Sequence, residues 1–273
     1  MISLPITLSL VFYISFAIYV LLGIYVLWLN PREMLNRVFF VATISLGAWA
    51  FCFSIANSAP DYEVSLLWRR MATIGWGSAY SVLLHFFLIL TERKRLLQSR
   101  LLYILLYMPV LVNIYIFGLS PHAIGQYELI YTTFGWVNIP LYTTWNVLFN
   151  IYFFSCSLIG FILLAHWGIT AKDRKKKKQS LLLFLAFALA LIIGTTTDFI
   201  LNPYLETMIP QVSPTVSLIP MLAIFYSIKH YGLLKRPEKE YLAEPGKILS
   251  EDIHSKVFQI ISLLFMASGI VGF

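Results

Sequence analysis

The chain has 273 residues, of which 59% are hydrophobic, 16% are aromatic and only 12% are charged. Soluble domains of this size carry about twice that share of charged residues, so the composition excludes an ordinary soluble domain and indicates a polytopic helical membrane protein. The net charge of +7 does not indicate a nucleic-acid partner, because the basic residues lie mostly in short connections between apolar runs and the base-reading motifs are absent.

Seven apolar runs follow one another along the chain, and a bilayer core of about 30 Å needs about 20 such residues per helix. The pattern predicts an all-α fold: a polytopic seven-transmembrane-helix bundle, followed by the start of a further apolar helix. The seven predicted spans are residues 5–29, 34–57, 64–91, 101–119, 141–167, 181–201 and 215–228.

Basic residues alternate strictly between the connections. They occur after spans one, three, five and seven, and are absent after spans two, four and six. The positive-inside rule therefore predicts an amino terminus outside the cell and a seventh span that ends in the cytoplasm, as in a multi-pass plasma-membrane protein. The lysine run 175–178 either anchors this orientation at the lipid headgroups or binds an anionic lipid, so membrane lipids are predicted partners.

The sequence predicts three parts, two of which lie after the seventh span. Residues 1–234 form the seven-span domain, 235–256 a mixed-charge cytoplasmic linker, and 257–273 an eighth apolar run near the lower length limit for a span. That last run either lies along the inner interface or leads back through a further helix. We expect the chain to be a fragment of a longer protein.

The third run carries charge into the membrane, because Arg69 and Arg70 lie about two turns inside it. At helical spacing Arg69, Thr73, Trp76 and Tyr80 share one face. A polar face cannot be turned toward lipid, so it should line the bundle interior or a water-filled cavity. We interpret this face, with Arg70 on the adjoining stripe, as the wall of a pocket on the outer side.

Other candidates for the pocket come from later spans. Asp198 lies at a depth that matches the arginines, which predicts a salt bridge; the alternative is that the arginines reach the headgroups and Asp198 caps a helix end. Asn146 either lines the pocket or joins helices through its amide. The connection 120–140 has no Lys or Arg and is rich in aromatics, which predicts a lid. The candidate ligand-binding residues are Arg69, Arg70, Thr73, Trp76, Tyr80, Asn146 and Asp198.

No motif of an enzyme is present: there is no paired-carboxylate motif, metal-ligand spacing, glycine-rich phosphate loop or nucleophile elbow, so we expect no catalytic residue, metal or cofactor. Cys52 and Cys156 lie in apolar runs and are predicted to pack as small hydrophobes. Two other functions stay open. One is a small-molecule membrane transporter, and the other is a lipid-modifying membrane enzyme, for which only His85 and Asp198 could serve.

Four stretches resemble the amino-terminal seven-helix sensor region of bacterial histidine kinases and some diguanylate cyclases. They are WRRMATIGW at 68–76, the run 86–91, TTFGWV at 132–137 and FYSIKHYGLL at 225–234. The resemblance covers residues 6–234. It implies a membrane input module that senses a small-molecule or lipid-like ligand outside, drives a cytoplasmic kinase or cyclase, and acts as a homodimer. It also implies structural or pocket roles for Trp68, Arg69, Gly135 and Trp136.

Overall fold

The computed structural model describes residues 3–201 and 209–231, and these residues belong to one compact unit. The predicted linker 235–256 and the predicted eighth helix 257–273 lie outside the described residues, as does the connection 202–208.

The predicted all-α bundle is confirmed, with six helices long and apolar enough to cross a membrane and a shorter apolar segment after them. Two spans end in π-helical turns, η1 and η3, and the last span is divided at Ser217 into α8 and α9. The elements are α1 (Leu4–Leu29), α2 (Met34–Ala56), α3 (Tyr62–Leu90), α4 (Lys94–Leu97), α5 (Arg100–Asn113), η1 (Ile114–Leu119), α6 (Thr144–Thr170), α7 (Arg174–Thr195), η3 (Thr196–Leu201), α8 (Ser213–Val216) and α9 (Leu218–Tyr231).

The start of the sixth span differs from the prediction. The helix α7 begins at Arg174 and not near residue 181, because the Asp173 side chain accepts a hydrogen bond from the Lys175 amide at 2.9 Å and caps the helix. The lysine run therefore forms the first turns of a helix, which suits its helix propensity, and is not part of an open connection.

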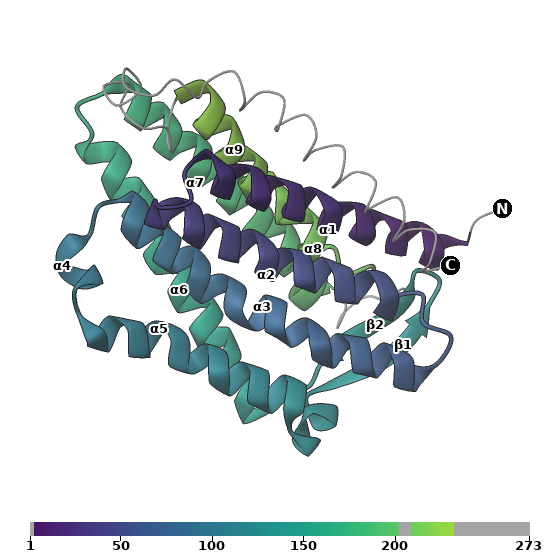
Figure 1. Cartoon of the computed structure of the whole chain (residues 1–273). Helices are drawn as coiled ribbons and strands as arrows, with labels where there is room; N and C mark the ends of the chain where they lie inside the picture. Colours follow the sequence, from purple (N-terminus) through teal and green to yellow (C-terminus); the bar gives the residue numbers. More distant parts are fainter. Residues whose placement is uncertain (1–2, 202–208, 232–273) are drawn as a thin grey trace. The chain divides into compact units, whose positions relative to one another are not determined.

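Helices α2 and α3 form the centre of the bundle, and their spanning windows are about two thirds buried. They approach closely at Gly75, where a Cβ atom would lie 2.5 Å from the Ser45 carbonyl oxygen and 2.6 Å from the Trp49 amide nitrogen. A small residue is what permits such close helix packing in a membrane. Around this pair, α1 packs on α2, α6 packs on α3 and α7, and α9 packs on α7 and α1 (Figure 1).

The connection predicted to be a lid folds as a 3-10 helix, η2 (Pro121–Gln126), and an antiparallel hairpin of β1 (Tyr127–Thr132) and β2 (Gly135–Pro140). Thr132 pairs with Gly135, so residues 133 and 134 form the turn. The Thr132 hydroxyl donates to the Gly135 carbonyl at 2.9 Å. The all-α prediction missed these two strands, although their aromatic and β-branched residues are typical of strands.

The hairpin turn is held at the end of α2 by Asn57. Its side-chain amide donates to the Phe134 carbonyl at 2.9 Å and to the Pro5 carbonyl at 3.1 Å, and its own carbonyl accepts from the Trp136 amide at 3.0 Å. Gly135 adopts φ +102°, and a Cβ atom there would collide with the Asn57 carbonyl. The hairpin lies at the end of the bundle opposite α4 and the α6–α7 connection, where the basic clusters occur (Figure 1).

The two cysteines are free. Cys52 is buried in the apolar core and Cys156 packs against it.

Candidate functional site

A cavity of about 90 Å³ lies beneath the hairpin, and we call it the polar chamber. Helices α2, α3 and α6, the turns η1 and η3, the hairpin and the residues before α8 contribute to its wall. Five of the seven candidate residues predicted from the sequence line it: Arg69, Trp76, Tyr80, Asn146 and Asp198. The sequence prediction missed other wall residues, including Trp49, Phe53, Tyr127, Asn138, Gln211 and Ser213.

Arg69 is 4% exposed and joins three parts of the chain. Its Nη1 donates to Asn138 Oδ1 at 2.5 Å and to Gln211 Oε1 at 3.0 Å, and its Nη2 donates to the Trp136 carbonyl. The guanidinium carbon also lies 4.7 Å from the centre of the Phe53 ring, a cation–π contact. Because these acceptors come from β2 and from the segment before α8, Arg69 fastens both to α3.

Asp198 faces the same chamber but does not form the predicted salt bridge. Its Oδ1 accepts from the Thr197 hydroxyl at 2.8 Å, and the Ser213 hydroxyl and the Val212 and Ser213 amides also hydrogen-bond to it. Among the residues that the structure describes, no ion pair joins it to either arginine. The prediction from matched depth was therefore correct in that Arg69 and Asp198 line the same cavity. Their hydrogen bonds, however, are made with neutral groups and not with each other.

Arg70 and Thr73 lie outside the wall of the polar chamber. The Arg70 Nε donates to the Gly118 carbonyl at 2.8 Å and its Nη2 to the Leu119 carbonyl at 3.1 Å, where η1 ends. Thr73 is buried against Gly118. The reason is that η1 packs on this strip of α3, where Arg70 satisfies carbonyls that a helix end leaves without an intrahelical partner. Their role in ligand binding stays a prediction.

Asn138 and Gln211 form a pair that closes the polar chamber between the hairpin and α8. The Gln211 side-chain amide donates to the Asn138 carbonyl at 3.1 Å, and the Asn138 amide donates to Gln211 Oε1 at 3.3 Å. The alternation of β2 puts Trp136 and Asn138 on one face of the strand. Recognising the strand in the sequence would have indicated Asn138, whereas no sequence pattern singled out Gln211.

Tyr127 begins β1 and also lines the polar chamber. Its hydroxyl oxygen is buried and has no hydrogen-bond partner among the described residues. Burial raises the pKa of Tyr127 to about 12, although the nearby positive charge of Arg69 acts in the opposite direction. A buried hydroxyl without a partner is energetically unfavourable, so it is a group that a bound molecule could satisfy.

Asn146 fixes the start of α6. Its side-chain amide donates to the Gln126 carbonyl at 2.6 Å and to the Leu141 carbonyl at 2.9 Å. Both partners flank the hairpin in sequence, so Asn146 attaches the hairpin segment to the start of α6.

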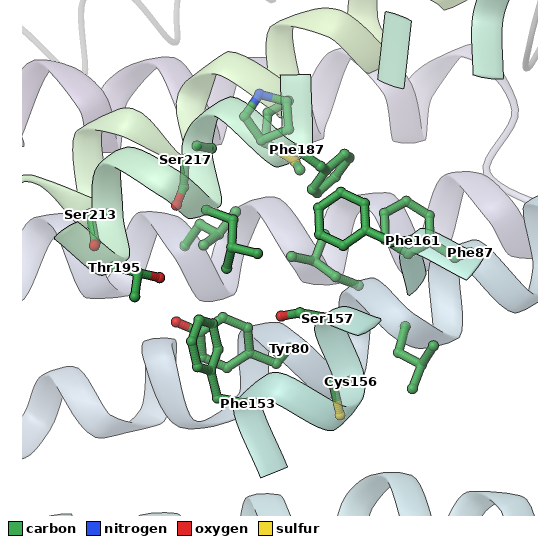
Figure 2. A pocket seen from close by; sticks show the side chains of 18 of the residues that line it. Tyr80, Phe87, Phe153, Cys156, Ser157, Phe161, Phe187, Thr195, Ser213 and Ser217 are labelled. Atoms are coloured by element: carbon green, nitrogen blue, oxygen red, sulfur yellow. The ribbon is translucent and has the colours of Figure 1, made fainter. Parts of the chain in front are cut away.

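A second cavity of about 90 Å³ adjoins the first, and we call it the apolar chamber. Trp49, Tyr80 and Ser213 line both chambers. Figure 2 shows the hydroxyl groups of Thr195, Ser213 and Ser217 and the Tyr80 side chain at one end, and phenylalanine rings at the other. The two chambers thus lie side by side and share part of their walls, and most of the charged and amide side chains line the polar one. The rings at the apolar end are Phe87, Phe161 and Phe187.

His85 lines neither chamber. Its Nδ1 lies 2.7 Å from the Tyr107 hydroxyl, and its ring packs edge-on against Tyr103 and Tyr107 of α5. It packs α3 against α5, whereas Asp198 lines the polar chamber. The described residues contain no group of three His, Cys, Asp or Glu side chains that could hold a metal ion.

Comparison with known proteins gives one result that bears on identity. No curated protein matches the chain. The model of the N-terminal seven-transmembrane region of histidine kinases matches residues 11–237. That range includes the two motifs that Arg69 joins, WRRMATIGW in α3 and TTFGWV in the hairpin. The chain therefore belongs to the family of N-terminal seven-transmembrane regions of histidine kinases.

Proposed function

We propose that the chain is the input domain of a plasma-membrane receptor in which a ligand from the outer side occupies the polar chamber and changes the activity of a cytoplasmic histidine kinase or diguanylate cyclase. Membership of the family makes it a multi-pass membrane sensor input domain. The distribution of basic residues supports an orientation with the hairpin outside.

The observation that carries the proposal is the position of Arg69. This buried cation connects α3, the hairpin and Gln211, which lies two residues before α8. A ligand in the polar chamber therefore contacts a junction between the predicted outer surface and the last described span. Ser217, Pro220 and Met221 of that span also line the apolar chamber.

Polar contacts attach the last described span to α1. The Tyr19 hydroxyl donates to the Pro214 carbonyl at 2.8 Å, and Ser15 Oγ lies 3.1 Å from Thr215 Oγ1. A ligand that prefers one position of α8 and α9 shifts the population of that position in proportion to its preference. Because α9 leads toward the cytoplasmic side, such a shift reaches an output domain, which is the coupling that the proposal requires.

The test measures output in membranes that contain the complete gene product, by autophosphorylation or by cyclic dinucleotide synthesis. Asn138→Ala and Gln211→Ala should change the output several-fold at normal expression, because each loosens the junction at Arg69. Ser155→Ala is the matched control, since Ser155 is exposed on α6 and lines neither chamber.

Two results would contradict the proposal. One is unchanged output in both variants when the proteins are folded. The other is a gene product with no kinase or cyclase domain and no such protein bound to it. Substrate uptake by vesicles that contain the purified chain would then favour a transporter.

A further inference from the structure

We infer that the ligand of the two chambers is a single-tail amphiphile with an uncharged, oxygen-bearing head, the head lying in the polar chamber and the tail in the apolar chamber. The inference rests on the proposed function and specifies the chemical class of the ligand.

The charge of the polar chamber selects an uncharged head. Of its lining residues, Arg69 is the cation and Asp198 is the carboxylate, and the other polar ones are neutral. The two charges therefore balance across the chamber, and each is already hydrogen-bonded. A head with net charge would add an uncompensated charge to a site that is largely removed from water, which is strongly unfavourable.

Hydrogen-bonding groups of the chamber select oxygen atoms. Arg69 makes three hydrogen bonds through Nη1 and Nη2, whereas a guanidinium has five donors. Its Nε and the Tyr127 hydroxyl are buried and have no hydrogen-bond partner within residues 3–201 and 209–231. The local surplus is therefore one of donors, and hydroxyl, ether or carbonyl oxygens of a head group would satisfy it.

The junction between the chambers suits the polar link of an ester or amide. Tyr80 and Ser213 line both chambers at this point, and Thr195 and Ser217 add hydroxyl groups to it (Figure 2). The Thr195 hydroxyl is buried without a partner among the described residues. A carbonyl oxygen at the link between head and tail could accept a hydrogen bond from this hydroxyl group.

The size and lining of the apolar chamber select one tail. The chamber has a volume of about 90 Å³, and Phe87, Phe161 and Phe187 lie at the end away from the hydroxyl groups. This small volume favours one short hydrocarbon tail over the two tails of a bilayer phospholipid. Burial of each methylene group in such surroundings is favourable, so longer tails should bind more tightly until the chamber is filled.

The experiment uses the chain in nanodiscs, which avoid competition from detergent, and counts bound molecules by native mass spectrometry. The probes are 1-monodecanoylglycerol, decanoate, decyltrimethylammonium and glycerol. Monodecanoylglycerol should bind at least tenfold more tightly than each of the other three. Equal or tighter binding of decanoate or decyltrimethylammonium would overturn the uncharged head, and equal binding of glycerol would overturn the tail.

Two variants locate the probe. Ser157 lines the apolar chamber, so Ser157→Phe should fill it and weaken monodecanoylglycerol binding at least tenfold. Ser155→Phe, on the exposed side of α6, should leave binding unchanged. Equal binding in the two variants would overturn the placement of the tail.

A third variant tests the charge balance independently. Asp198→Asn leaves Arg69 uncompensated, so the preference should move about tenfold toward decanoate, which is the size expected for one hydrogen bond to a charged group. A structural role of Asp198 alone would weaken the binding of all probes equally, and that result would overturn the charge argument.

If no amphiphile binds while Asn138→Ala still alters output, the inference fails and the receptor function stands. If monodecanoylglycerol binds but no chamber variant alters output, the receptor function fails instead.

Discussion

Arg69 and Arg70 are adjacent on α3, yet they hold two different regions of the molecule. Arg69 is buried and fastens the hairpin and the segment before α8 around the polar chamber. Arg70 is half-buried and fastens the end of η1 to α3. Both donate to neutral oxygens, and among the described residues neither forms an ion pair with a carboxylate. The difference lies in what each connects, because Asn138 and Gln211, two partners of Arg69, line the polar chamber, whereas Gly118 and Leu119 do not.

The largest effect is expected for Arg69→Ala, which removes three hydrogen bonds and leaves the Asn138 and Gln211 side chains without their cation. We expect it to lower the free energy of unfolding by about 3 kcal/mol, measured by denaturant titration in detergent micelles. Arg69→Lys should recover only part of this loss, because an ammonium group cannot reproduce the planar fork. An equal loss of unfolding free energy in Arg70→Ala would contradict the proposed difference between the two arginines.

Gly135→Ala should give the second largest effect. The φ of +102° is unfavourable for alanine, and the added Cβ would collide with the Asn57 carbonyl. We expect about 2 kcal/mol of destabilisation and faster hydrogen exchange throughout residues 127–140. Gly125→Ala is the control, since a Cβ at Gly125 meets no atom within 4 Å. Unchanged exchange in the Gly135 variant would contradict the role of the turn in anchoring the hairpin.

Asn138→Ala removes one hydrogen bond to a charged group, which stabilises by about 1.5 kcal/mol. The loss should appear as faster hydrogen exchange in the hairpin and near Gln211, with no change in η1. Faster exchange in η1 would show that the two regions are coupled, contrary to the comparison.

Arg70→Ala should cost about 1 kcal/mol, because the guanidinium is half-buried and its carbonyl partners lie at a helix end. Hydrogen exchange should become faster in residues 114–120 and stay unchanged in the hairpin, which is the reverse of the pattern expected for Asn138→Ala. Normal output of the complete receptor is also expected, and loss of output would assign Arg70 to the ligand site after all.

Tyr127→Phe should have the smallest effect, a change within about 0.5 kcal/mol in the free energy of unfolding at neutral pH, because the deleted hydroxyl has no hydrogen-bond partner in the part of the chain that the structure describes. The raised pKa gives a second test. A tyrosine with a folded pKa of about 12 and an ordinary unfolded value near 10 contributes stability below pH 10 that is lost as the pH rises toward 12. The difference in ultraviolet absorbance between wild type and variant should therefore show ionisation near pH 12, and ionisation near pH 10 would contradict burial.

Several features followed from the sequence alone, because they depend on local composition and spacing. The apolar runs predicted the seven-helix bundle, since a membrane helix must satisfy its backbone internally over a fixed length. Helical spacing placed Arg69, Trp76 and Tyr80 at one cavity, and matched depth added Asp198. The motifs at 68–76 and 132–137 indicated the family, which the comparison confirmed.

Other features were decided only by the tertiary structure. The sequence could not assign Asn138 and Gln211 to Arg69, because residues separated by 69 and 142 positions meet only after the hairpin folds onto α3. Arg70 contacts the end of η1 and not the polar chamber, because η1 packs on its side of α3. The salt bridge was predicted from the need of each charge for a partner, but that need does not specify which partner is nearest. Amides and carbonyls of the surrounding segments satisfied it, and their positions are a property of the packed bundle.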